Sequence, residues 1–298
     1  MVEAVERKIE QYIKTLDEPK ILTLYRELPL GKRLRAKLIL RIAGSNLRVV
    51  KTAAIVEMIH AASLLHDDVI DDANMRRKRP SINALYGDKT AIMFGDILYS
   101  KGFLELNEVD PKVAQIISSA VVELSLGEYN DVTLSKKFTT DKELYLKMIY
   151  QKTASLIEAS SHAAAILAGK QEKPYRTYGR NLGLAFQMID DILDITSDSA
   201  TLGKPALHDF QEGKTTLPYI YLYEKLDTVE REKLKSFHAK KLNTHEQEWI
   251  KMQMKKYKII EKSYAEAKVL IDEAIALMSS EKEEALSSIA REMIERDF

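Results

Sequence analysis

The chain contains no cysteine, so disulfide bonds, thiolate zinc sites and a cysteine nucleophile are excluded. Glycine and proline are also scarce, with 11 and 7 residues among 298, and few positions interrupt regular secondary structure. Lysine plus arginine equals aspartate plus glutamate at 45 each, so no overall charge attracts nucleic acid. No apolar run approaches the ~20 residues that cross a bilayer, and the first residues lack the features of a signal peptide. We therefore expect a cytoplasmic protein without a transmembrane segment or a nucleic-acid partner.

Apolar residues repeat every three or four positions through most of the chain, and this spacing predicts an all-α protein. The expected helices lie at about 3–16, 33–44, 48–72, 90–107, 111–131, 141–168, 175–195, 215–226 and 247–278. Pro111 should start one helix, and Thr140 with Glu143 resembles a capping box for the next. Gly169 should end that helix. No linker, low-complexity tract or short repeat divides the sequence, so we expect residues 1–298 to form a single domain.

Two helices each carry an Asp-Asp-x-x-Asp cluster in apolar surroundings, in LLHDDVIDD at 64–72 and FQMIDDILD at 186–194. Carboxylates four positions apart project from the same stripe of a helix and repel each other, more strongly once water is withdrawn. A cation must therefore balance them, and an all-oxygen ligand set favours Mg²⁺. The predicted metal ligands are Asp67, Asp68 and Asp71 in the first cluster and Asp190, Asp191 and Asp194 in the second.

Other interpretations of the acidic clusters are possible. A single Asp-rich patch is ordinarily a solvated surface, whereas two patches in otherwise apolar helices favour a binding site on facing helices of a bundle. Neither cluster has the glycine and ligand spacing of an EF-hand. Glu57 and His60 have the Glu-x-x-His spacing of di-iron bundles. A di-iron helical-bundle protein remains an alternative, although Glu158 and His162 are one residue too far apart to supply the second copy.

Several further short motifs follow one another in a recognisable order. They are GKRLR at 31–35, RR at 76–77, KTA at 152–154, FQ at 186–187, GKP at 203–205 and DFQEGKTTLP at 209–218. Together with the two aspartate clusters, these motifs resemble the trans-isoprenyl diphosphate synthases, the family of farnesyl, geranylgeranyl and longer polyprenyl diphosphate synthases. The resemblance covers most of the chain. Leu30 and Ala36 depart from it, since the family has glycine and proline at these positions.

The resemblance implies a large helical bundle around a central cavity, a likeness to the isoprenoid synthase fold, and a homodimer. It implies that isopentenyl diphosphate is held by Lys32, Arg35, His60 and Arg77. It implies that the allylic diphosphate contacts Arg76, Lys152, Thr153, Gln187, Lys204 and Lys214. The implied catalytic groups are Asp67, Asp68, Asp71, Asp190 and Asp191 with Lys152 and Lys204, acting with three Mg²⁺ ions per active site. Taken singly, each basic residue could instead be a solvated surface charge.

The residues just before the first cluster bear on product length. In the family, the side chains at these positions limit the length of the growing prenyl chain. Here the positions hold the small residues Ala62 and Ser63, and the motif DDVID has no two-residue insertion. A small side chain one turn from Asp67 leaves space for a prenyl tail between helices. We therefore expect a long product such as octaprenyl diphosphate, with geranylgeranyl or farnesyl diphosphate synthase as the alternative. Met93, Phe94 and Leu124 are candidates for the floor that stops growth.

Two related activities also remain open. A terpene cyclase would share the ionisation chemistry but would usually replace the second cluster with a mixed Asn/Ser/Glu motif. A non-catalytic partner subunit of a prenyltransferase would be expected to lack one cluster. This chain carries both clusters.

Overall fold

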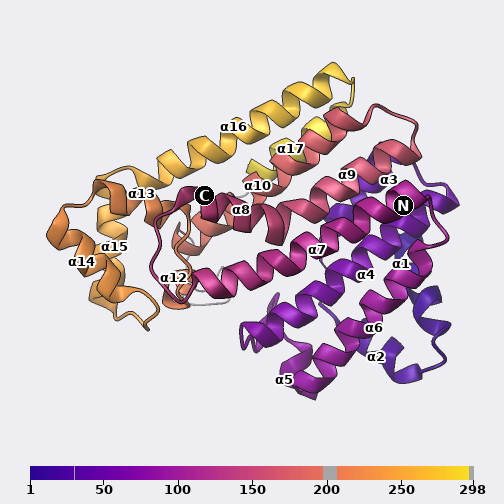
Figure 1. Ribbon diagram of the computed structural model, residues 1–298, viewed down its shortest axis with the longest axis horizontal. Helices are drawn as coiled ribbons and strands as arrows, with labels where there is room; N and C mark the ends of the chain where they lie inside the picture. The colour runs from indigo at the N-terminus through magenta and orange to yellow at the C-terminus, as the bar shows by residue number, and fades with distance from the viewer. Residues whose placement is uncertain (30, 197–206, 295–298) are drawn as a thin grey trace. The chain divides into compact units, whose positions relative to one another are not determined.

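The computed structural model describes residues 1–29, 31–196 and 207–294, and nearly all of its regular structure is helical (Figure 1). A short antiparallel ribbon pairs β1 (Met75–Arg76) with β2 (Arg79–Pro80). The expected all-α class is therefore confirmed. The chain divides into two compact units, one of residues 1–122 and 156–179 and the other of residues 123–155 and 180–298. That the whole chain forms one prenyltransferase domain stays a prediction.

The first unit is built around a long, buried helix, α4. Its elements are α1 (Val2–Lys14), α2 (Pro19–Glu27), α3 (Leu34–Ala43), α4 (Leu47–Ile70), the β-ribbon, α5 (Ile82–Tyr86), α6 (Asp88–Leu106), the start of α7 (Pro111–Leu134), most of α9 (Ser155–Leu167) and the start of α10 (Glu172–Thr196). Helix α4 packs against α1, α3 and α6. Asn46 caps its start by accepting a hydrogen bond from the backbone N–H of Val49.

Helix α4 is also long and apolar enough to cross a membrane by length and composition, and it alone passes that test among the described residues. In its most apolar window, 72% of the residues are buried within the protein. A buried core helix has the same composition as a membrane span, so this feature is weak evidence for one.

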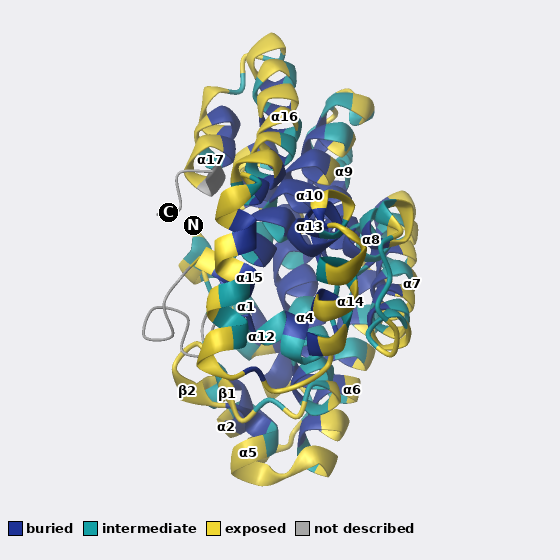
Figure 2. Cartoon of the chain, turned by 90° about the vertical axis from the view of Figure 1, so that its left-hand side faces the viewer, coloured by how far each residue is buried: buried dark blue, intermediate teal, exposed yellow. Residues whose placement is uncertain are grey.

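The second unit contains the rest of α7, then α8 (Lys142–Ile149), a π-helical segment η1 (Tyr150–Ala154) and the rest of α10. Its remaining described helices are α12 (His208–Gln211), α13 (Leu217–Lys225), α14 (Thr228–Phe237), α15 (Thr244–Lys256), α16 (Ile259–Ser280) and α17 (Glu284–Ile294). Helix α16 packs against α13, α15 and α17. Figure 2 shows α10 and α13 as mostly buried, while α16 turns much of its surface to solvent.

Local signals placed some helix ends correctly and missed others. Pro111 begins α7, and Gly169 follows α9 with a φ of +65°, as expected. The predicted capping box is wrong by one residue, because Asp141 caps α8 by accepting hydrogen bonds from the N–H groups of Glu143 and Leu144. The predicted helix 247–278 is two helices, since Lys258 adopts a left-handed conformation with φ of 53° between α15 and α16.

Candidate diphosphate and metal sites

The first turn of α3 places Arg35 in a cationic cluster of the first unit. Arg33, in a left-handed conformation, caps this helix and forms an ion pair with Glu57 at 3.3 Å. Glu57 is 2% exposed and also accepts a hydrogen bond from the backbone N–H of Ala36 at 2.9 Å. Glu57 therefore contacts the residues on both sides of Arg35, the side chain of Arg33 and the backbone of Ala36. These contacts fix the position of Arg35. The glutamate of the possible di-iron motif is thus occupied by protein donors.

Arg77 lies against the same loop. Its guanidinium donates a hydrogen bond to the carbonyl of Pro29 at 2.8 Å, and a Cβ on Gly31 would lie only 2.5 Å from its Nη1. The absence of a side chain at Gly31 therefore leaves space for the Arg77 guanidinium, and the GKRLR motif contacts the arginine pair at 76–77 there. Lys32, the neighbouring predicted ligand, is exposed.

The electrostatics of this cluster favour an anion. Burial, followed by the charges of Arg35 and Arg77, lowers the pKa of His60 well below its usual value. Burial also lowers the pKa of Arg35 to about 10, an effect that Glu57 opposes and Arg77 reinforces. Within the described part of the chain, the buried Nε of Arg35 has no hydrogen-bond partner. A bound diphosphate would supply both the missing acceptor and the missing negative charge.

The first aspartate cluster ends helix α4. Asp68 is buried, accepts a hydrogen bond from Nε of Arg76 at 2.7 Å and forms an ion pair with Nη2 of the same guanidinium at 2.6 Å. Burial nevertheless raises the pKa of Asp68. Asp67 and Asp71 lie half-buried beside it, Asp71 as the C-cap of the helix. Carboxylates at a helix C-terminus face the negative end of the macrodipole, so this arrangement is stabilised by a cation.

The second aspartate cluster lies at the C-terminal end of α10. Asp191 is 3% exposed and accepts hydrogen bonds from the Tyr145 hydroxyl at 2.7 Å and the Gln187 amide at 2.9 Å. Asp194 accepts one from the backbone N–H of Asp209 at 3.2 Å. Burial raises the pKa of Asp191 to about 8, and the charges of Asp209 and Asp190 add to this effect. The carboxylates of Asp190 and Asp209 thus lie close enough to Asp191 to disfavour its ionisation.

Residues of the KTA motif reach this cluster from the π-helical segment η1. Thr153 donates a hydrogen bond to the Gln187 side chain at 2.7 Å, which links it through Gln187 to Asp191. Lys152 forms ion pairs with Asp131 at 2.7 Å and Glu128 at 2.9 Å. π-Helical turns often occur at functional sites, because they reposition side chains relative to a regular helix.

Lys214 joins the same region. A cavity of about 20 Å³ is lined by Asp131, Tyr145 and Lys214, among others, so the ion-pair partner of Lys152 and the hydrogen-bond donor to Asp191 border it together. Lys214 also pairs with Glu212 at 3.0 Å. Lys204, the remaining predicted allylic ligand, lies outside the described residues.

Sequence reasoning missed three residues of this site. No role was predicted for Asp131, Tyr145 or Asp209. Asp131 pairs with Lys152, Tyr145 donates a hydrogen bond to Asp191, and the charge of Asp209 raises the pKa of Asp191. Asp209 could have been found, since it opens the segment DFQEGKTTLP. Asp131 and Tyr145 lie at ordinary helical positions and carry no local signal.

The donor chemistry of both clusters fits a hard divalent cation. Among residues 1–29, 31–196 and 207–294, no group of three or more His, Asp or Glu side chains forms a ready-made metal cage. Mg²⁺ typically uses one or two carboxylates and keeps several waters, so a closed protein cage is not required. The carboxylate oxygens at the C-terminal ends of α4 and α10 suit that mode of binding.

The residues predicted to control product length lie on α4, on the N-terminal side of the first aspartate cluster. Ala62 is fully buried, and Ser63 is half-buried with its hydroxyl donating to the carbonyl of His60 at 2.9 Å. Phe94 is buried on the neighbouring helix α6. Met93 is 60% exposed, so its side chain is not an interior floor of the single chain.

Glu158 and His162, the possible second half of a di-iron site, form ion pairs with other side chains, as Glu57 of the first half does. Glu158 pairs with Arg176 at 2.5 Å, and His162 pairs with Glu172 at 2.7 Å. These partners leave no support for the di-iron interpretation.

The fold and sites describe an all-helical protein with cationic and acidic clusters at the ends of core helices, and comparison with known proteins defines its family. Residues 19–256 match the family model for polyprenyl synthetases. The chain belongs to the polyprenyl synthetase family, which confirms the resemblance drawn from the ordered motifs.

Individual relatives agree with this assignment. The all-trans-nonaprenyl-diphosphate synthase (geranyl-diphosphate specific) of Rhodobacter capsulatus is 42% identical over 198 residues, which are 64% of this chain and 61% of that protein. The matched segment therefore spans less than two thirds of that relative. The octaprenyl pyrophosphate synthase structure from Helicobacter pylori has a TM-score of 0.94 and 43% identity, covering 99% of this chain and 98% of that one. The polyprenyl synthase from Caulobacter crescentus CB15, complexed with calcium and isoprenyl diphosphate, has a TM-score of 0.90 and 31% identity, covering 99% and 94%.

Proposed function

We propose that this protein is a trans-prenyltransferase that condenses isopentenyl diphosphate with an allylic diphosphate, repeatedly, to a long polyprenyl diphosphate such as octaprenyl diphosphate. The observation that carries the proposal is the placement of three aspartates at the C-terminal end of each of two core helices, α4 and α10. Membership of the polyprenyl synthetase family and the octaprenyl and nonaprenyl synthases among the relatives support it.

Isopentenyl diphosphate would bind the cationic cluster of the first unit. Arg35 and Arg77, with exposed Lys32, present the charges and forked donors that suit phosphate oxygens. The lowered pKa keeps His60 neutral, so it can donate a hydrogen bond without adding to the repulsion among the arginines. Holding this substrate in a fixed orientation would supply much of the rate of carbon–carbon bond formation.

The allylic diphosphate would bind the residues around the second cluster. Thr153 and Gln187 already share a hydrogen bond beside Asp191. Lys214 lines the nearby cavity, and Lys152 pairs with Asp131, which also lines it. Arg76 and Lys204 complete the proposed set. Lys152 would exchange its carboxylate partners for phosphate oxygens when substrate binds.

We further propose three Mg²⁺ ions held by Asp67, Asp68, Asp71, Asp190, Asp191 and Asp194. When bound, the ions would neutralise charge that develops on pyrophosphate as the allylic carbon–oxygen bond breaks. The calcium bound in the Caulobacter crescentus relative supports a divalent ion of this kind. The apolar flanks of α4 and α10 would exclude water, which would otherwise quench the allylic cation to an alcohol.

We also propose that the enzyme is cytoplasmic.

A product assay tests the function. Purified protein is incubated with Mg²⁺, labelled isopentenyl diphosphate and a panel of allylic primers, and the dephosphorylated products are sized. We expect polyprenols that lengthen to about eight isoprene units. Products that stop at farnesyl or geranylgeranyl length would leave a prenyltransferase but overturn the long-chain assignment. A cyclic hydrocarbon from an allylic diphosphate alone would indicate a terpene cyclase, and an inert chain would indicate a partner subunit.

Substitution of the aspartates tests the sites. Asp67→Ala and Asp190→Ala should each reduce turnover at least about 100-fold, because each removes a ligand for charge stabilisation in the transition state. Asp272→Ala is the matched control, since Asp272 is an exposed aspartate of α16 that pairs only locally with Lys268 at 2.7 Å. Near-normal rates in either cluster variant would contradict the proposed role.

A further inference from the structure

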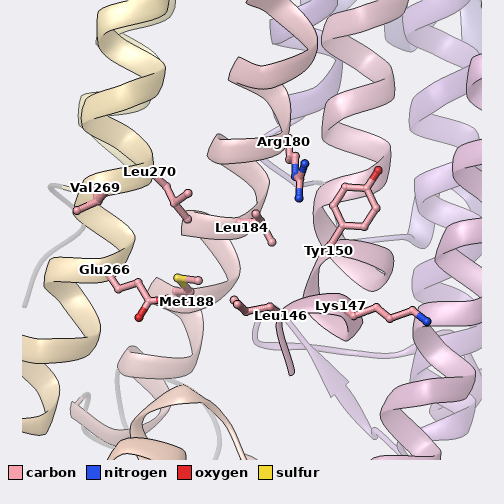
Figure 3. Close-up of a pocket in the computed structure, with 9 residues that line it drawn as sticks. All are labelled: Leu146, Lys147, Tyr150, Arg180, Leu184, Met188, Glu266, Val269 and Leu270. Carbon is pink, nitrogen blue, oxygen red and sulfur yellow. The ribbon is translucent and has the colours of Figure 1, made fainter. Parts of the chain in front are cut away.

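A second cavity lies in the second unit, and its lining contains none of the residues assigned above. It has a volume of about 550 Å³ and lies among α8, η1, α10 and α16 (Figure 3). Its apolar lining comes from Leu146, Leu184, Met188, Val269 and Leu270. Ligand pockets in proteins have this range of volume and this mainly apolar lining with a few polar groups. Neither aspartate cluster, nor Lys152, Thr153 or Gln187, lines it.

The charges around this cavity favour an anion. Arg180 and Lys147 belong to its lining, and both are exposed. Within the described residues neither forms an ion pair; Arg180 lies over the ring of Tyr150, 5.4 Å from its centroid. Glu266 also lines the cavity, but its carboxylate pairs with Lys142 at 2.8 Å and accepts a hydrogen bond from Tyr221. The net charge of the lining is therefore positive.

The cavity has an apolar part and, at its edge, a charged part. In Figure 3, Leu184, Met188 and Leu270 converge, while the guanidinium of Arg180 lies at one side, next to Tyr150. Lys147 extends its ammonium outward, and its long stem allows the charge to turn towards a ligand at the rim. Such a cavity suits a molecule with an apolar chain and an anionic head.

We propose that this cavity is a second binding site for a prenyl diphosphate, with the isoprenoid chain against Leu184, Met188 and Leu270 and the diphosphate at Arg180 and Lys147. The inference rests on the proposed function, because the enzyme would itself produce such a molecule. Two cations that form no ion pair within the described part of the chain match the multiple charges of a diphosphate better than those of a single carboxylate. A guanidinium also binds phosphate oxygens in a bidentate manner.

The absence of native cysteine permits a direct binding test. Val269 lines the cavity and is 56% exposed, so Val269→Cys can carry a single environment-sensitive fluorophore. The labelled protein is titrated with geranylgeranyl diphosphate, palmitate and inorganic pyrophosphate in EDTA. We expect a saturable spectral shift with geranylgeranyl diphosphate, at least 10-fold weaker binding of palmitate, and none with pyrophosphate. Equal affinity for palmitate, or no shift with geranylgeranyl diphosphate, would overturn the proposal.

Charge reversal tests the head-group contacts. Arg180→Glu and Lys147→Glu together should weaken binding of geranylgeranyl diphosphate at least 10-fold, whereas Lys251→Glu, at an exposed position on α15, should change it less than 2-fold. Equilibrium dialysis of the unlabelled variants should give the same ranking. Unchanged binding in the double variant would overturn the assignment.

This result is independent of turnover. EDTA removes divalent ions, and no condensation is measured, so a chain without prenyltransferase activity could still give the expected shift. Conversely, the product assay could succeed while the labelled protein fails to respond. Failure of the second site and failure of the proposed function are thus distinguishable.

Discussion

Asp191 illustrates at the scale of a residue how burial changes the protonation of a carboxyl group in an acidic site. Burial raises the pKa of Asp191 to about 8, so the folded protein holds a proton that the unfolded chain releases. Where the native state binds more protons than the unfolded state, the free energy of unfolding falls as pH rises. The stability contribution is present below pH ~4 and is lost as pH rises to about 8.

In EDTA, we therefore expect the urea midpoint of the wild-type protein to fall between pH 5 and pH 9. Asp191→Asn should flatten this dependence, because the amide cannot ionise. Added Mg²⁺ should raise the midpoint of the wild-type protein most at the higher pH. Equal slopes for the two proteins in EDTA would show that Asp191 is ionised throughout.

Ala62 provides a second test at this scale. Ala62 is fully buried on α4 one turn before the first cluster, so Ala62→Phe should fill the proposed path of the prenyl tail and shorten the product distribution. Chromatography of the dephosphorylated products measures the effect. Leu85→Phe, at a 50% exposed position of α5, is the control and should leave product length unchanged. A long product from folded Ala62→Phe would refute the gate.

At the scale of elements, glycines allow three helical segments to approach closely around η1. A Cβ on Gly183 of α10 would lie 2.5 Å from Cα of Ala154, the last residue of η1. A Cβ on Gly127 of α7 would collide with the backbone of Lys152. Because the obstructing atoms are backbone, the segments must separate if either glycine is replaced. Lys152 and Thr153 depend on this packing for their positions.

Gly183→Ala should destabilise the protein by about 1–3 kcal/mol through overpacking. Gly102→Ala is the matched control, since its Cβ would make ordinary contacts with the Ile59 side chain at 3.4 Å and with Ile55 at 3.9 Å. Replacing a helical glycine with alanine where space exists stabilises by up to ~1 kcal/mol. Urea denaturation measures both variants. Equal stability changes would show that α10 and η1 can separate without cost.

The elements also show where local reasoning fails. Long helices such as α4 and α7 were predicted nearly to their ends, because their apolar spacing is sustained and their caps are local. Helices α2, α14 and α17 were not predicted, since each has at most 11 residues and so offers few repeats of the apolar spacing. The π-helical turn in η1 was not predicted, because a segment of five residues is too short for its period to be read from apolar spacing.

At the scale of the whole molecule, α7 presents an apolar stripe to solvent. Val122, Leu126 and Tyr129 lie at helical spacing and are 60%, 45% and 69% exposed. Exposed apolar patches on soluble proteins commonly mark interfaces. The homodimer expected from the family resemblance would cover such a surface, and we propose α7 as part of its interface.

Leu126→Glu with Tyr129→Glu should therefore convert a dimer to a monomer in sedimentation equilibrium. Val229→Glu on α14 is the control, because Val229 is 79% exposed and lies on another helix. A wild-type protein that is monomeric at all concentrations would contradict the expected dimer. A dimer that survives the double substitution would place the interface elsewhere.

The family, the all-α class and the positions of both acidic clusters follow from sequence alone, since apolar spacing and short ordered motifs are local properties of the chain. That α4 and α10 both end in carboxylates was already visible in the two Asp-Asp-x-x-Asp strings. Only the tertiary structure decided that Lys152 pairs with Asp131 and that Tyr145 donates to Asp191. These pairings join side chains from different helices, and the spacing within one helix does not specify which residue of another it will meet.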